Sequence, residues 1–123
     1  MIAGVSAASP PPGFAVTERR EDERTILALE GELDISSASM LEESAERVVA
    51  AEETGAVVLD LGGLSFVDST GLRAIVNLRD RCGKEGRTFT MLPGPRTVQR
   101  LFELTGLIDV LPFESSQLDS AER

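Results

Sequence analysis

The stretch between residues 56 and 83 constrains the fold of this chain more than any other. Residues 56–59 are apolar with two valines in the middle, which is typical of a strand buried on both faces and central in a sheet. We predict a tight turn at the Gly62-Gly63 pair and an amphipathic helix over residues 69–83. The apolar stripe of this helix consists of Gly71, Ala74, Ile75, Leu78 and Cys82. A central strand followed by a covering helix predicts an α/β protein.

Shorter segments on both sides continue the alternation of strand and helix. Further strands are predicted over residues 14–17, 26–29, 88–92 and 107–111. Helices are predicted over residues 36–53, from Pro95 to a stop at Gly106, and weakly over residues 114–123. The charged residues 19–23 fit a solvated hairpin loop. The expected architecture is a mixed β-sheet of four to five strands covered by about four helices.

The length of 123 residues suits a single domain with a real core. Residues 1–12 are rich in small residues and proline, so we expect a flexible N-terminal tail, with the domain over residues 13–123. No apolar run is long enough to cross a bilayer, and residues 1–13 lack the features of a secretory signal. These features predict a cytoplasmic protein.

Charge and composition narrow the function classes. The net charge of −9, from 21 acidic and 12 basic residues, would repel nucleic acid and anionic membranes, so we expect a protein partner instead. The chain has no histidine and one cysteine, Cys82, which we expect in the core. It also lacks the glycine-rich motifs of nucleotide-binding loops. We therefore expect no metal, no cofactor and no catalytic activity.

The tetrapeptide Asp68-Ser69-Thr70-Gly71 stands where the helix over residues 69–83 begins. The first helical turn has backbone N–H groups without intrahelical partners and a partial positive charge, so a phosphate on Ser69 or Thr70 would be tolerated. The same residue types are favoured as helix caps, which gives a purely structural alternative. Asp68 could orient the Ser69 hydroxyl, but without histidine there is no catalytic triad.

Three separated motifs give the chain a resemblance to a known family. Gly31-Glu32-Leu33-Asp34, the Asp-Ser-Thr-Gly-Leu segment and residues 98–107 resemble, in this order, the STAS domains, most closely the free-standing bacterial anti-sigma factor antagonists. The resemblance covers roughly residues 14–113 and implies a STAS fold. It also implies that Ser69 is phosphorylated by the anti-sigma factor, itself a serine kinase, and reset by a metal-dependent serine phosphatase. Asp34 resembles the family's loop aspartate near the acceptor, or else merely caps the following helix.

The mechanism that the resemblance implies is partner switching. The unmodified protein binds the anti-sigma factor and frees the sigma factor, and phosphorylation of Ser69 releases the anti-sigma factor. The implied partner-binding residues are Asp34, Asp68, Ser69, Thr70, Gly71, Leu72 and Arg73. Arg73 departs from the small residue of many relatives and could pair with phosphate or with an acidic kinase, or simply offset the negative charge of the chain. Other STAS domains are accessory subunits of ABC-type lipid transporters or scaffolds of stress-signalling assemblies, which are the alternative functions.

Overall fold

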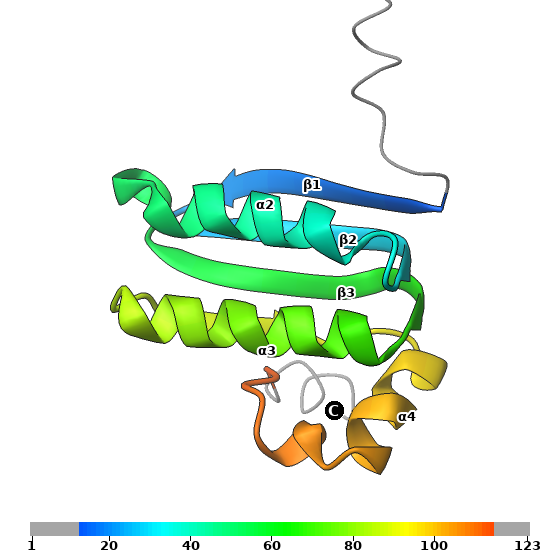
Figure 1. Ribbon diagram of the computed structural model, residues 1–123. Helices are drawn as coiled ribbons and strands as arrows, with labels where there is room; N and C mark the ends of the chain where they lie inside the picture. The colour runs from blue at the N-terminus through cyan, green and yellow to red at the C-terminus, as the bar shows by residue number, and fades with distance from the viewer. Residues whose placement is uncertain (1–12, 115–123) are drawn as a thin grey trace, which may run out of the picture.

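The computed structural model describes residues 13–114 as an α/β fold (Figure 1). Its elements in chain order are β1 (Phe14–Glu21), β2 (Arg24–Leu33), α2 (Ala38–Ala50), η1 (Glu52–Thr54), β3 (Ala56–Val67), α3 (Ser69–Lys84), β4 (Phe89–Leu92), α4 (Arg96–Leu104) and η2 (Leu107–Asp109), where η marks a short 3-10 helix. The expected N-terminal tail and the weak last helix over residues 114–123 fall outside the described residues, apart from Glu114.

The four strands form one mixed sheet in the order β1-β2-β3-β4. β1 pairs with β2 in antiparallel fashion, whereas β2 with β3 and β3 with β4 are parallel. The predicted central position of residues 56–59 is confirmed, because β3 has a neighbour on each side and Val57, Val58 and Leu59 are at most 1% exposed. The apolar composition of this segment follows from burial on both faces.

The main core lies between the sheet and the helices α2 and α3, which run along the same face of the sheet (Figure 1). The predicted apolar stripe of α3 is buried throughout. Burial of a leucine or isoleucine side chain stabilises a fold by about 1.5–3 kcal/mol, so the stripe holds α3 firmly on the sheet. The expectation that Cys82 lies in the core is confirmed, because it is 0% exposed, and this burial raises the pKa of its thiol to about 11.

The predicted hairpin between the first two strands is confirmed, but its turn is shorter than the charged loop expected over residues 19–23. Residues 19–21 belong to β1, and Glu21 pairs directly with Arg24, so that the turn consists only of Asp22 and Glu23. Asp22 has a φ of 55°, a left-handed conformation that aspartate tolerates in tight turns. Charged side chains on this outer strand also discourage pairing with other chains, which explains why a strand can look like a loop in sequence.

The Gly62-Gly63 pair is not a turn, because β3 continues through it to Val67. The register between β2 and β3 shifts here, between Ala28 and Glu30. A Cβ atom on Gly63 would lie 2.8 Å from the backbone oxygen of Leu29 and 2.9 Å from Cγ of Glu30. Glycine at position 63 therefore permits a close approach of two strands at an irregularity of the sheet.

The predicted strand over residues 107–111 was also wrong, since this segment contains η2 and a turn. Gly106 has a φ of 80° just after α4, consistent with the predicted helix stop. Pairing with β4 comes later: Met91 N–H donates to Pro112 O at 3.0 Å, and Glu114 N–H donates to Met91 O at 2.9 Å. This contact is a single bridge and not a fifth strand.

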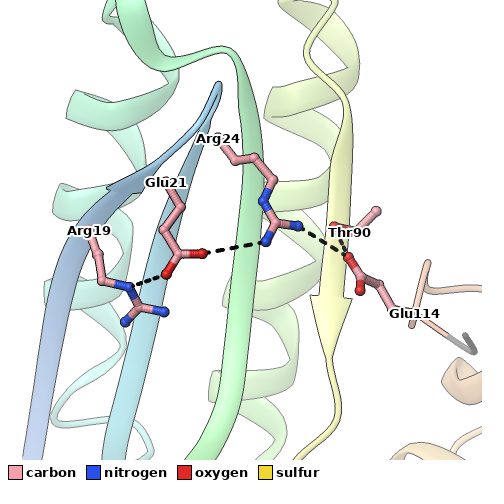
Figure 2. Close-up of polar contacts among 5 residues, drawn as sticks. All are labelled: Arg19, Glu21, Arg24, Thr90 and Glu114. Carbon is pink, nitrogen blue, oxygen red and sulfur yellow. Dashed lines mark hydrogen bonds and ion pairs between the residues drawn. The ribbon is translucent and has the colours of Figure 1, made fainter. Parts of the chain in front are cut away.

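The opposite face of the sheet carries a chain of polar side chains (Figure 2). Arg19 contacts Glu21 at 2.9 Å, Glu21 contacts Arg24 at 3.6 Å, and Arg24 reaches Glu114 at 3.8 Å. The carboxylate of Glu114 also accepts a hydrogen bond from the Thr90 hydroxyl at 3.1 Å. These groups link β1, β2 and β4 to residue 114, although exposed ion pairs contribute at most about 1 kcal/mol each.

Candidate functional site

The candidate site lies where β2 and β3 end side by side. The strands are parallel, and their last residues Leu33 and Val67 are partners in the register. The residues that follow, Asp34 and Asp68, therefore begin two adjacent connections, one leading to α2 and the other directly to α3. Parallel strands of an α/β sheet commonly place functional groups at this edge.

Asp68 links these two connections through hydrogen bonds. It is the N-cap of α3, and its Oδ1 accepts a hydrogen bond from Gly71 N–H at 2.9 Å. Its Oδ2 accepts from Ile35 N–H at 3.2 Å, and its own N–H donates to Leu33 O at 3.1 Å. Asp68 thus fixes the start of α3 against the β2–α2 connection.

Ser69 is the first residue of α3, and its side chain is exposed. Thr70 follows it and is half-buried. Among residues 13–114, neither hydroxyl forms a hydrogen bond with another residue. The geometry therefore makes Ser69 the more accessible of the two hydroxyl groups for a modifying enzyme.

Asp34 organises the connection between β2 and α2. Its Oδ1 accepts hydrogen bonds from Ser36 N–H at 2.9 Å and from Ser36 Oγ at 2.7 Å. The Ser36 hydroxyl bond is the main reason that the pKa of Asp34 lies below its ordinary value. The N-cap of α2 is Ser37, not Asp34. The alternative that Asp34 caps this helix is therefore wrong, and its side chain closes the turn before the helix.

Gly71 and Leu72, both among the predicted partner-binding residues, lie in the interior. A Cβ atom on Gly71 would be 2.6 Å from Leu33 O and 3.1 Å from Cγ2 of Val67. The missing side chain lets α3 approach the ends of β2 and β3 closely. Both residues position Ser69 and leave little of their own surface for a partner.

Arg73 lies on the exposed side of α3, one helical turn after Ser69. Among residues 13–114 it forms no ion pair. The structure thus brings together Asp34, Asp68 and Ser69, and it places Arg73 on the adjoining turn of the helix.

Two exposed apolar residues near this edge were missed in the sequence analysis. Ile35 is 78% exposed and follows Asp34, and Phe66 is 46% exposed and lies opposite Glu32 in the β2–β3 register. The position of Ile35 in an otherwise polar connection was a signal for exposure. Phe66 gave no such signal, because its orientation depends on the irregular register that follows Gly62-Gly63.

The order of the sheet, the two covering helices and the hydroxyl-bearing start of α3 together define a class of domain. The chain matches the STAS domain family over residues 15–120 and belongs to that family.

Similar proteins are named anti-sigma factor antagonists. The chain is 31% identical over 99 residues to the anti-sigma-F factor antagonist of Mycobacterium tuberculosis, covering 80% of each chain. It is 33% identical over 81 residues to the anti-sigma-B factor antagonist of Bacillus subtilis, covering 66% of this chain and 72% of that one. The crystal structure of an anti-sigma factor antagonist from Mycobacterium paratuberculosis aligns with a TM-score of 0.76 and 27% identity, covering 93% and 96% of the chains.

Among residues 13–114, no three histidine, cysteine, aspartate or glutamate side chains are placed to hold a metal ion. No helix there is both long and apolar enough to span a membrane.

Proposed function

We propose that this protein is an anti-sigma factor antagonist whose binding is switched off by phosphorylation of Ser69. The observation that carries the proposal is the exposed Ser69 at the start of α3, beside a connection that holds Asp34 and Ile35. Similarity to proteins named anti-sigma factor antagonists supports the class of partner. In this proposal the unmodified protein binds the anti-sigma factor in the cytoplasm, and the sigma factor is released for transcription.

The proposed partner is also the kinase that ends the interaction. Ser69 Oγ attacks the γ-phosphorus of ATP held by the anti-sigma factor, the bond to the bridging oxygen breaks, and ADP leaves. The hydroxyl proton passes to a base of the kinase. Asp68 has a structural role in this proposal, because backbone hydrogen bonds to both its carboxylate oxygens hold it at the start of α3. A metal-dependent serine phosphatase then hydrolyses the phosphate ester and restores the binding form.

Charge and desolvation explain how the modification would release the partner. A phosphate adds about −1.5 to −2 charges and three acceptor oxygens to a surface that already contains Glu32, Asp34 and Asp68. A docked partner would have to desolvate this dianion, which is costly without a cation of its own in place. Because Ser69 is exposed, the same charge can be solvated in the free protein without disturbing the core.

A pair of baits tests the proposal in a lysate of the native host. The Ser69→Ala protein should capture an ATPase with a kinase fold, identified by mass spectrometry, and the Ser69→Glu protein should lose it. The purified ATPase should transfer labelled phosphate to the parent chain but not to Ser69→Ala. Thr97 is exposed on the first turn of α4, so Thr97→Ala and Thr97→Glu are matched controls that should capture as the parent does.

Three results would overturn the proposal. Equal capture by both Ser69 baits would indicate that Ser69 has only a structural role at the start of α3. Capture of an ABC-type ATPase would favour the accessory subunit of a lipid transporter, and recovery in a particle of high mass would favour a scaffold.

A further inference from the structure

Arg73 differs from the other arginines of α3 in its surroundings. Arg79 contacts Asp80 at 3.0 Å, and Arg81 contacts Glu46 on α2. Arg73 is exposed and forms no ion pair among residues 13–114. An exposed cation that has no acidic partner among these residues is available for an anion that arrives later.

Ser69 lies at the position on α3 that Arg73 can reach most easily. Residues four apart on a helix have Cβ atoms about 5–6 Å apart, and helical side chains lean towards the N-terminus, here over the turn that contains Ser69. The other residues three or four positions from Arg73 are Thr70, Val76 and Asn77, none of them acidic. A phosphate on Ser69 would therefore be the first acidic group within one helical turn of Arg73 on α3.

Asp68 engages two of the backbone N–H groups at the start of α3. Its Oδ1 accepts from Gly71 N–H at 2.9 Å, and its carbonyl oxygen accepts from Leu72 N–H at 2.9 Å. These two donors are not available to a phosphate on Ser69. The carboxylates of Asp68 and Asp34 also add negative charge near Ser69, so a nearby cation would stabilise the phosphate beyond what the positive end of the helix supplies.

We propose that Arg73 is the intramolecular counter-ion of phosphorylated Ser69. In the modified protein its guanidinium donates N–H hydrogen bonds to the phosphate oxygens, an arrangement for which the planar fork of arginine is well suited. An anion that precedes the cation by four residues is also the favourable order on a helix. The inference rests on the proposed function in one respect, namely that Ser69 is the residue that carries the phosphate.

The second ionisation of the phosphate tests this pairing directly. Phosphoserine is installed at position 69 during translation, in the full chain and in its Arg73→Gln and Arg79→Gln variants, and the ³¹P shift is followed from pH 4 to 9. Loss of a neighbouring cation disfavours the dianion, so Arg73→Gln should raise the second phosphate pKa by about 0.3. Arg79 has the same charge but lies ten residues beyond Ser69, about 15 Å along the helix, and its variant should leave that pKa unchanged.

An unchanged pKa in Arg73→Gln would overturn the proposal, as would an equal rise in Arg79→Gln, which would indicate only the general field of the chain. Because Arg73 is exposed, its variant should fold, and thermal unfolding of the unmodified proteins checks this. The titration contains no partner. The pairing can therefore be refuted while capture of the anti-sigma factor succeeds, and it can be confirmed while that capture fails.

Discussion

At the scale of single residues, the start of α3 contains one residue that exposes a hydroxyl group and others that hold the helix in position. Ser69 is exposed and bears the proposed acceptor hydroxyl, whereas Gly71, two residues later, is buried against the end of β2. Asp68 can reach both Gly71 N–H and Ile35 N–H only while α3 lies close to the β2–α2 connection. The absence of a side chain at position 71 is therefore a condition for the geometry around Ser69.

We expect Gly71→Ala to destabilise the protein, because the new methyl group would lie 2.6 Å from Leu33 O. Forcing one methyl group into a packed site costs roughly 1–3 kcal/mol, which denaturant titration would show as a lower midpoint. Gly83→Ala is the matched control on the same helix. Nothing lies within 4 Å of its new Cβ, so it should stabilise by about 0.5–1 kcal/mol. Equal midpoints for the two variants would contradict this account.

At the scale of elements, the sequence patterns predicted what depends on local periodicity. The central position of β3, the buried stripe of α3 and the stop of α4 shortly before Gly106 followed from spacing and composition. The patterns failed where the outcome depends on a distant segment. Glycine occurs both in turns and at close approaches of strands, and only the proximity of Leu29 to Gly63 distinguishes the two.

The candidate site shows the same division. Asp68 and Ser69 could be recognised because an aspartate before a hydroxyl residue is a local signal for a helix start. The turn-closing role of Asp34 depends on Ser36, and the exposure of Phe66 depends on the β2–β3 register. Neither arrangement is encoded in the spacing of residues along one element.

We expect the ends of β2 and β3 to bind the partner partly through Ile35 and Phe66, both exposed in the free protein. The Ile35→Ser and Phe66→Ser variants should each bind the anti-sigma factor at least about fivefold more weakly, because a central apolar contact is typically worth 1 kcal/mol or more. Titration calorimetry with the purified partner measures this change. Leu104→Ser, at a residue of α4 that is 69% exposed, is the control and should bind as the parent does. An equal loss in all three variants would argue against a local docking surface.

At the scale of the whole molecule, the proposed switch changes a surface and leaves the fold intact. The chain has a net charge of −9, so a phosphate increases a negative charge that is already large. The core below the site consists of apolar residues of β2, β3, α2 and α3. Among residues 13–114, no residue forms a hydrogen bond with the hydroxyl group of Ser69 or Thr70. Binding and folding can therefore respond separately to the same modification.

We expect Ser69→Glu to unfold at a temperature within about 4 °C of the parent, because a substitution at an exposed position usually changes stability by no more than roughly 0.5 kcal/mol. Its backbone amide shifts should change only at the start of α3 and in the β2–α2 connection. Leu72→Glu provides the contrast, since it buries a carboxylate at a position that is 9% exposed and should strongly lower the unfolding temperature. A strongly lowered unfolding temperature for Ser69→Glu, as expected for Leu72→Glu, would mean that the partner is released by unfolding. It would refute a docking surface that is switched by charge alone.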